Sequence, residues 1–178
     1  MNRSPELAAA CEVARREVIA AGQFLGRRQY HVALAGNISV RVSPDLLVCT
    51  RHGADKEALS HKDLVLCDMA GRRLEGEGEA TSELNMHREA YRLRPDVQAV
   101  IHSHPPAATA FAATGTSLDQ LQLPEMLVLL GPVCLAPYAT PGSEQLAQNL
   151  SPLLPDHDAF LLENHGALTL GRSARQAA

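Results

Sequence analysis

The stretch Val97-Gln-Ala-Val-Ile-His102-Ser-His104-Pro-Pro is an apolar run that ends in two histidines separated by one residue. Alternate residues of a β-strand point to the same face, so both imidazoles are expected to project toward one point at the strand's end. Two convergent imidazole nitrogens suit a divalent metal, and zinc first, because zinc binds histidine nitrogen at about 2.0–2.1 Å. The stretch therefore predicts a central strand over Val97–His102 with a metal site at its end.

Length and composition limit the classes of protein that need to be considered. The chain has 178 residues, of which 46% are hydrophobic and 20% charged, which predicts one globular domain with a substantial core. A net charge of −4 without a basic stripe argues against nucleic acid as a partner. No signal peptide is recognisable, and no apolar run reaches the roughly 18 residues that a bilayer requires. We expect a cytoplasmic protein with no membrane partner.

The four cysteines support the same compartment. They are widely spaced without a C-x-x-C pair, and three of them stand in apolar runs, which indicates buried reduced thiols rather than a disulfide framework.

Hydrophobic periodicity predicts alternating helices and strands. The expected helices are Pro5 to about Phe24, Thr81 to about Arg94, Ala107–Ala113 and Gln145 to about Leu153. The expected strands are Ile38–Val42 with one buried face, Leu46–Thr50, Leu64–Asp68, Val97–His102, Ala159–Leu162 and Ala167–Leu170. The first two strands are expected to form a hairpin, while the apolar runs Leu127–Leu130 and Val133–Ala136 receive no element. The pattern favours an α/β or α+β sheet layered with helices.

A third metal ligand is sought among the 8 histidines. His165 follows an apolar strand in the tight turn Glu163-Asn164-His165-Gly166, from which it could reach a metal bound by His102 and His104. His61 and His157 stand among charged or turn residues, which predicts that both are solvated. His87 lies on a predicted helix without a second ligand, so packing is its expected role. Three histidines leave one position open on a tetrahedral ion, which is typical of a catalytic site.

Glu83 is the carboxylate best placed for the open side, because its helix leads directly into the His102 strand. A carboxylate that ligates the metal at rest and leaves it when substrate arrives could act as a general base. Two plainer explanations stay open at this point. A carboxylate in a first helical turn is favoured by the helix dipole alone, and His102 and His104 could merely end a strand.

Two polar loops contain glycine. Gly36-Asn37 is either a plain turn or an anion-binding loop, and Thr50-Arg51-His52-Gly53 is a second loop of this kind.

Four motifs together resemble the class II aldolase/adducin family. They are Gly36-Asn37-Ile38-Ser39, Thr81-Ser82-Glu83, the run from Tyr91 through His102-Ser-His104-Pro, and Asn164-His165-Gly166, and they occur in the family's order over nearly the whole chain. The resemblance implies a central, mostly antiparallel sheet in a three-layer fold, assembled as a homotetramer with active sites near the subunit boundaries. It also implies zinc held by His102, His104 and His165, with Glu83 as a further ligand and the acid/base residue. The substrate phosphate would lie in loops formed by Gly36, Asn37, Thr50, Gly53, Thr81 and Ser82, where glycine backbone, hydroxyls and a helix N-terminus favour an anion.

The activity that this resemblance implies is a zinc-dependent lyase reaction on a phosphorylated ketose, like that of L-fuculose-1-phosphate aldolase. The products would be dihydroxyacetone phosphate and an aldehyde, formed through a metal-stabilised enediolate. Lys56 and Lys62 are the only lysines, and neither is expected in an apolar pocket, which disfavours a Schiff-base route.

The family also contains enzymes that catalyse different reactions on similar substrates. These reactions are methylthioribulose-1-phosphate dehydration, pentulose-phosphate 4-epimerisation, whose enzymes carry Asp in place of Glu83, and decarboxylation, which ranks lower. A non-catalytic adducin-like interaction module is the competing hypothesis outside enzymology, although such modules tend to lose the metal ligands.

Two departures from the family pattern stand out. His52 replaces the small hydroxyl residue that the fuculose enzyme has before the glycine of its second phosphate loop. Residues 1–178 are expected to form one family-like domain without the family's C-terminal helices, one of which supplies an aromatic acid. That role would fall to Tyr138 or to a residue of a neighbouring subunit.

Overall fold

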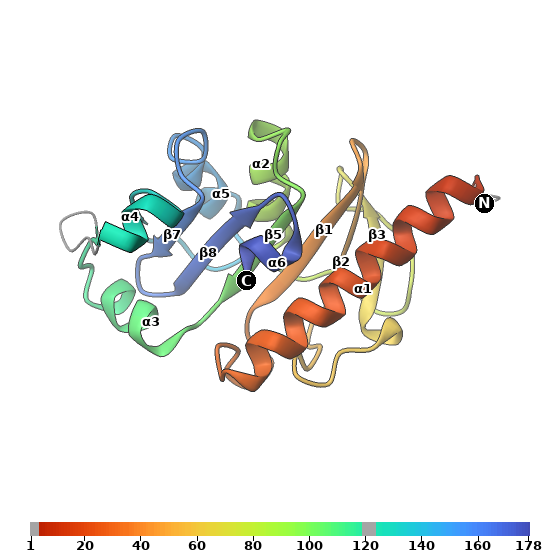
Figure 1. The fold of residues 1–178 in the computed structure, drawn as a ribbon, viewed down its shortest axis with the longest axis horizontal. Helices are drawn as coiled ribbons and strands as arrows, with labels where there is room; N and C mark the ends of the chain where they lie inside the picture. Colours follow the sequence, from red (N-terminus) through yellow and green to blue (C-terminus); the bar gives the residue numbers. More distant parts are fainter. Residues whose placement is uncertain (1–3, 119–123) are drawn as a thin grey trace.

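A computed structural model describes residues 4–118 and 124–178 of the chain. Its strands form one eight-stranded sheet in the order β4-β3-β2-β1-β5-β8-β7-β6 (Figure 1). Neighbouring strands pair antiparallel, except for β6 and β7, which are parallel. The strands are β1 (Asn37–Ser43), β2 (Leu46–Thr50), β3 (Leu64–Asp68), β4 (Arg73–Glu75), β5 (Ala99–Ser103), β6 (Cys134–Ala136), β7 (Ala159–Leu162) and β8 (Gly166–Gly171).

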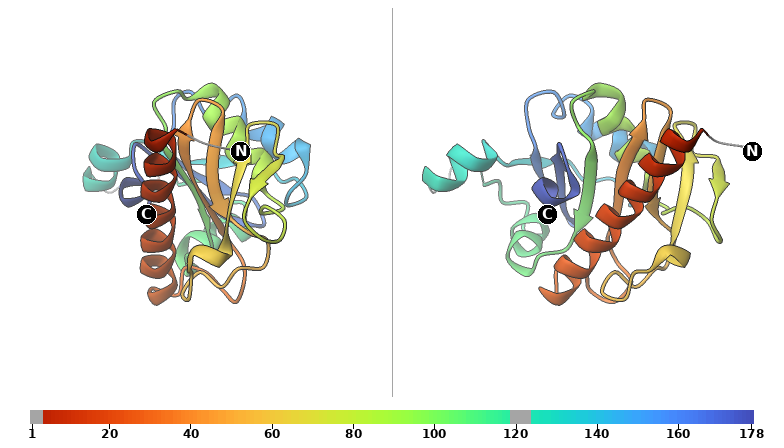
Figure 2. Two further views of the ribbon diagram at one scale, coloured as in Figure 1. Left: turned by 90° about the vertical axis from the view of Figure 1, so that its right-hand side faces the viewer. Right: turned by 45° about the vertical axis from the view of Figure 1, so that its right-hand side comes forward.

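Helices cover both faces of this sheet, as the two views of Figure 2 make clear. One face packs against α1 and α6 through a core that includes Val18, Ile38 and Ile101. The other face packs against α2 and α5 through a core that includes Tyr91, Val100 and Leu150. The helices are α1 (Pro5–Arg27), α2 (Leu84–Leu93), α3 (Pro106–Ala113), α4 (Pro124–Leu130), α5 (Glu144–Leu150) and α6 (Ala174–Ala177), with the single-turn 3₁₀ helix η1 at His61–Asp63. The predicted three-layer α/β fold with a mostly antiparallel sheet is confirmed.

The first strand differs from the sequence expectation in an instructive way. Alternation of apolar residues predicted one buried face, yet Ser39 is 0% exposed on the opposite face and Asn37 is 3% exposed. The reason is tertiary, because α2 covers that face and gives its polar side chains buried partners. Polar residues on β1 therefore belong to the interior.

Several element boundaries also differ. The first helix continues to Arg27, and α5 ends at Leu150, three residues before the expected end. β4 was not expected, because its three exposed residues carry no apolar alternation. The apolar run after Pro124 forms helix α4, whose Val128 is 84% exposed.

In the described part of the chain, no helix is long and apolar enough to cross a membrane. Cys11, Cys49 and Cys67 are buried thiols, as expected from the apolar runs around them.

Candidate functional site

The polar motifs gather at one end of the central strands, where β1 begins and β5 ends, at the lower side of Figure 1. Antiparallel pairing sets Asn37 directly opposite His102. On the other side of β5, Ser103 pairs with Ala167, which brings the turn between β7 and β8 to the same end of the sheet. Residues from three distant parts of the chain thus meet through strand register alone.

Three histidines converge at this end of the sheet. His102, His104 and His165 each offer one ring nitrogen, and these atoms lie within 4.8 Å of one another. The Nε2 atoms of His102 and His104 are 3.0 Å apart. Gly166 makes this approach feasible, because a Cβ atom at that position would overlap the His104 ring. The structure therefore brings together the three histidines that the sequence singled out.

The histidines are held in the neutral state that metal binding requires. His102 is fully buried, and its Nδ1–H donates to the carbonyl oxygen of Ala167 at 2.9 Å, which directs the Nε2 lone pair toward the cluster. Burial first, and then the neighbouring histidines, lower the pKa of His102. Burial likewise lowers the pKa values of His104 and His165, the latter against the opposing effect of Glu83.

Glu83 completes the cluster from the start of α2. Its Oε2 lies 3.3 Å from His102 Nε2, and its Oε1 lies 3.3 Å from His165 Nε2. Glu83 stands at the N-cap position of α2, but its side chain makes no capping hydrogen bond. The carboxylate is turned toward the histidines rather than toward the helix, so capping does not account for it.

This donor set fits a small divalent cation. Four ligand atoms arranged tetrahedrally around an ion at about 2.0–2.1 Å lie roughly 3.3–3.4 Å from one another. The separations between Glu83 and His102 and between Glu83 and His165 are both 3.3 Å. Neutral imidazoles and one carboxylate are the ligands that zinc and similar metals prefer.

A buried chain of hydrogen bonds runs from the interior to Glu83. Asn37 Nδ2 donates to Glu83 Oε2 at 2.7 Å, because a carboxylate only accepts. Asn37 Oδ1 therefore accepts from His87 Nε2–H at 2.6 Å. The His87 Nδ1 is then an acceptor, and it receives the Ser39 hydroxyl at 2.7 Å. Ser39 in turn accepts the hydroxyl of Tyr91 at 2.9 Å.

Every donor and acceptor direction in this chain follows from the hydrogen bond that Asn37 Nδ2 donates to the Glu83 carboxylate at its end. Burial lowers the pKa of His87 to about 3 and raises the pKa of Tyr91, so both side chains are neutral near pH 7. The chain thus holds the Glu83 carboxylate in one fixed orientation. His87 was expected only to pack. Its further role was signalled by two spacings in the sequence: His87 and Tyr91 are four residues apart on one face of α2, and Asn37 and Ser39 are two residues apart on one face of β1.

A cavity of about 250 Å³ adjoins the histidine cluster. Glu83 lines it on one side, and five of the six residues predicted to hold a phosphate line the rest: Gly36, Asn37, Gly53, Thr81 and Ser82. Thr50 lies behind this lining, fully buried, where its hydroxyl accepts the backbone N–H of Ile38 at 3.3 Å. His52 lines the cavity as well and is exposed.

Lys56 departs from the sequence expectation. It was not expected in an apolar pocket, and most residues that line its cavity are polar, but its burial to 2% exposure was not foreseen. No apolar periodicity marks residues 53–58, so burial of Lys56 could not be read from the sequence. Tyr138, the candidate acid, is 52% exposed just after β6.

Comparison with known proteins places the chain in a family. Residues 16–178 match the model of the Class II Aldolase and Adducin N-terminal domain, and the chain belongs to this family. An L-fuculose phosphate aldolase of Methanococcus maripaludis is 34% identical over 161 residues, which cover 90% of this chain and 86% of the relative. A 3-oxo-tetronate 4-phosphate decarboxylase of Escherichia coli is 31% identical, covering 92% of this chain and 79% of the relative.

Solved structures agree with the fold. The protein YgbL of Klebsiella pneumoniae, described as an aldolase, epimerase or decarboxylase, superposes with a TM-score of 0.86 at 30% identity, over 93% of this chain and 82% of that one. An L-fuculose 1-phosphate aldolase superposes with a TM-score of 0.84 at 32% identity, over 92% and 77% of the two chains. Together with the family match, these relatives identify an aldolase- or lyase-type enzyme.

Proposed function

We propose that this protein is a zinc-dependent lyase that cleaves a phosphorylated ketose and releases dihydroxyacetone phosphate. One observation supports it above the others: Glu83 is shared between the histidine cluster and the cavity. Its carboxylate oxygens face His102 and His165 at 3.3 Å, while the same residue lines the glycine-rich cavity. An anion in the cavity would therefore hold the adjacent carbons of a substrate against a general base.

The substrates named for the relatives share one chemical fragment. L-fuculose 1-phosphate and 3-oxo-tetronate 4-phosphate both carry a ketone flanked by a phosphorylated methylene and a hydroxymethine carbon. Cleavage of the bond from that hydroxymethine carbon to its next neighbour leaves the electron pair on the hydroxymethine carbon, as an enediolate. Protonation there gives dihydroxyacetone phosphate in both cases. The departing group is an aldehyde in the first case and carbon dioxide in the second.

The roles of the residues follow from this fragment. Gly36, Asn37, Gly53, Thr81 and Ser82 would bind the phosphate through backbone N–H groups, hydroxyls and the start of α2. Glu83 would deliver the proton to the hydroxymethine carbon, and would remove it again in the condensation direction. The chain of hydrogen bonds behind Asn37 would hold the carboxylate in a fixed orientation. His102, His104 and His165 would hold zinc, which when bound supplies Lewis-acid polarisation of a substrate carbonyl.

Decarboxylation is the second candidate, and the 31% identity to a 3-oxo-tetronate 4-phosphate decarboxylase favours it over dehydration and epimerisation. Aldol cleavage and decarboxylation need the same base, the same phosphate pocket and the same metal. They differ in one proton transfer: aldol cleavage must also remove the proton of the hydroxyl that becomes the aldehyde carbonyl, whereas release of carbon dioxide from a carboxylate needs no such step.

Proton exchange tests the half-reaction that both candidates share. Wild-type protein loaded with zinc, incubated with dihydroxyacetone phosphate in D₂O, is expected to exchange one hydroxymethyl proton stereospecifically, as followed by ¹H NMR. The Glu83→Gln variant should bind the same amount of zinc without exchange. Absence of exchange in the zinc-loaded wild type, with the fold intact, would sink the proposal.

Product analysis then separates the two candidates. L-fuculose 1-phosphate and 3-oxo-tetronate 4-phosphate are supplied separately, and dihydroxyacetone phosphate, aldehyde and carbon dioxide are measured independently. Dihydroxyacetone phosphate with equimolar aldehyde identifies the aldolase, whereas equimolar carbon dioxide identifies the decarboxylase.

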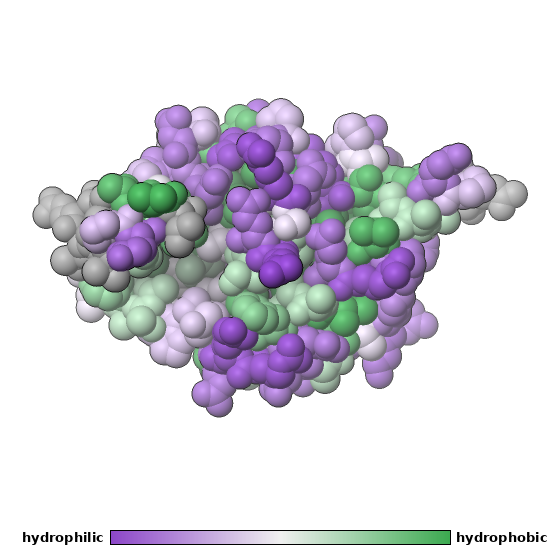
Figure 3. All heavy atoms as spheres, in the orientation of Figure 1, coloured by the Kyte–Doolittle hydropathy of each residue, from purple (hydrophilic) through white to green (hydrophobic). Residues whose placement is uncertain are grey.

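We further propose a cytoplasmic homotetramer. The three buried thiols suit a reducing compartment. The apolar side chains of Met126, Leu127 and Val128 on α4 are exposed, and Figure 3 shows this apolar patch at the left of the molecule. Such a patch suits burial between subunits. Light scattering should give four times the chain mass of 19.1 kDa.

A further inference from the structure

Lys56 stands out among the residues that line the cavity, because it is a buried cation. Its side chain is 2% exposed, although lysine is almost never fully buried without a partner. Two backbone carbonyls fix the ammonium group, one from Ala54 at 2.8 Å and one from Leu34. These carbonyls belong to two loops that border the cavity, so the ammonium is held between them rather than free to move.

Lys56 has no counter-ion within the described residues. No carboxylate there lies within 4.0 Å of its nitrogen, while the neighbouring Arg51 pairs with Asp63 at 2.9 Å and donates to the carbonyl of His52. The contrast matters because both residues line the same cavity. Arg51 is neutralised by its partner, whereas the carboxylates of Asp55 and Glu83 act on Lys56 only from beyond ion-pair distance. A buried charge of this kind is unfavourable unless an anion accompanies it.

An ammonium group has three donors, and the two carbonyls use two of them. The third is available to a ligand in the cavity, where glycine backbone and the hydroxyls of Thr81 and Ser82 also converge. A phosphate monoester carries the charge and the several acceptor oxygens that such a set of donors requires. Neutral sugar hydroxyls would leave the ammonium group of Lys56 without a direct ionic partner.

A second side chain near this loop adds to the polar surroundings. His31 is buried at 9% exposure, its ring lies against Gly36, and both of its nitrogens are without a hydrogen-bond partner. Burial, with a further contribution from the charge of Lys56, lowers the pKa of His31 to about 4. His31 is therefore neutral near pH 7 and offers an N–H but no charge.

We propose that Lys56 is the charged contact for the substrate phosphate and sets the preference of the site for phosphorylated over unphosphorylated ketoses. This inference rests on the proposed function for the identity of the ligand. It assigns Lys56 a binding role and not a covalent one. A Schiff base requires the amine lone pair, which the protonated ammonium lacks. Burial lowers the pKa of Lys56 to about 8, which still leaves the protonated form in the majority at pH 7.

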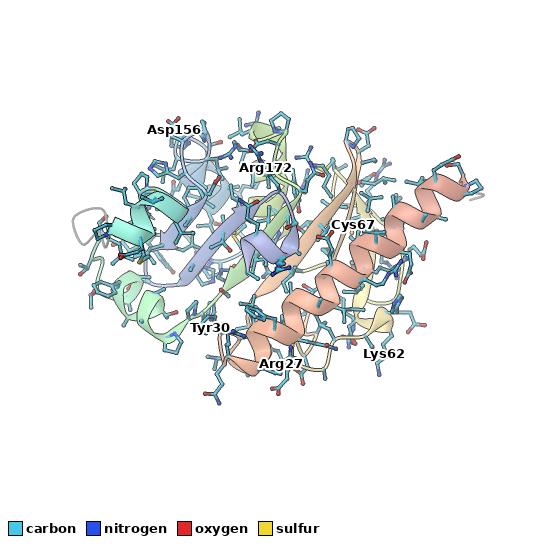
Figure 4. All side chains as sticks on the ribbon, viewed as in Figure 1. Arg27, Tyr30, Lys62, Cys67, Asp156 and Arg172 are labelled. Atoms are coloured by element: carbon cyan, nitrogen blue, oxygen red, sulfur yellow. The ribbon has the colours of Figure 1, made fainter. Side chains whose placement is uncertain are left out.

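The composition of the chain allows a direct test without enzyme turnover. Lys56 and Lys62 are the only two lysines, so protein labelled with ¹³C at the lysine ε-carbon gives two signals in an NMR spectrum. Lys62 is exposed and points outward from η1, as labelled in Figure 4, and serves as the internal control. Titration with inorganic phosphate should move the Lys56 signal and raise its apparent pKa, and should leave the Lys62 signal unchanged. Phosphate binding that moves neither signal would overturn the proposal.

Substitutions of Lys56 distinguish the contribution of its charge to phosphate binding from its role in anchoring the two loops. Lys56→Gln keeps a donor for one carbonyl but removes the charge, Lys56→Met removes both, and Lys62→Met is the matched control. We expect Lys56→Gln to weaken inorganic phosphate binding at least tenfold in calorimetry, with zinc content and thermal midpoint close to wild type. Lys62→Met should match wild type throughout. If only Lys56→Met weakened phosphate binding, Lys56 would be a structural anchor and the proposal would be wrong.

Kinetics distinguish failure of this inference from failure of the proposed function. An active lyase whose Lys56→Gln variant keeps its KM for the phosphorylated ketose refutes the role of Lys56 alone. A protein that exchanges no proton on dihydroxyacetone phosphate, yet shows the NMR shift, retains the anion site and refutes the lyase. Borohydride trapping of dihydroxyacetone phosphate on Lys56 would replace the binding role with a covalent one.

Discussion

Replacing Asn37 by alanine tests the hydrogen-bonded chain that supports Glu83. Asn37 is 3% exposed. Its Nδ2 donates to Glu83 Oε2 at 2.7 Å, and its Oδ1 accepts from His87 Nε2 at 2.6 Å. Alanine removes a bond to a charged acceptor, worth about 1.5–3 kcal/mol, and leaves the buried His87 N–H without an acceptor, at a cost of about 1–3 kcal/mol. Water from the adjoining cavity can replace part of this loss, because Asn37 lines that cavity. The expected destabilisation is about 2–4 kcal/mol.

Chemical denaturation of the metal-free protein measures this free energy of unfolding directly. For a chain of this length the thermal midpoint should fall by about 4–16 °C. Asn149→Ala is the matched control, because the Asn149 amide donates to two carbonyls at the surface and its loss should cost less than about 1 kcal/mol. Equal destabilisation by the two substitutions would refute the buried hydrogen bonds of Asn37 with Glu83 and His87.

Asn37→Asp probes the direction of the hydrogen bond between Asn37 and Glu83, and the pH dependence of the proton-exchange reaction is the measurement. The new carboxylate oxygen would face Glu83 Oε2 in place of the amide donor, so one of the two groups must keep a proton. Because Glu83 must be deprotonated to act as the base, the acidic limb of the exchange reaction should then move to higher pH. An unchanged pH profile would mean that Asn37 presents its oxygen, not its nitrogen, to Glu83.

Three further predictions address the metal, the base and the buried imidazole. Glu83→Gln should retain zinc through the three histidines and lose about 10²–10⁴-fold in turnover, measured by metal analysis and initial rates; a normal rate would remove Glu83 from the mechanism. His104→Ala should purify with much less than one equivalent of metal, and added zinc should restore activity to chelator-treated wild type but not to this variant. The folded-state pKa of His87 is about 3, below its unfolded value, so its neutral form stabilises the fold above about pH 6.5, and this stabilisation is lost as the pH falls toward 3. Between pH 7 and pH 5 the loss in the free energy of unfolding amounts to about 2 kcal/mol. The free energy of unfolding of His87→Gln, measured by denaturation, should therefore fall less steeply as the pH is lowered.

Sequence alone determined the elements whose pattern is local. An apolar run that ends in H-x-H predicted a strand that presents two imidazoles to one point, and the ring nitrogens of His102 and His104 lie 3.0 Å apart. The turn around His165 was equally readable, because a strand must reverse between residues 162 and 166. Helical spacing places Leu84, His87, Ala90 and Tyr91 on one face of α2, and all four are buried. Such features depend on spacing along one segment.

Tertiary structure decided the features that depend on what covers a segment. The polar residues Asn37 and Ser39 looked like the solvent face of β1, and only the packing of α2 turned them into a buried hydrogen-bonded chain to Glu83. Lys56 lies in a polar loop without periodicity, so its burial follows from the approach of neighbouring loops and not from its own neighbours in sequence. Spacing can place a ligand on a strand, but the cost of burying a charge or an amide is set by contacts between distant segments. For that reason the three clustered histidines were visible in the sequence, while the hydrogen-bonded chain behind Glu83 and the burial of Lys56 became visible only in the fold.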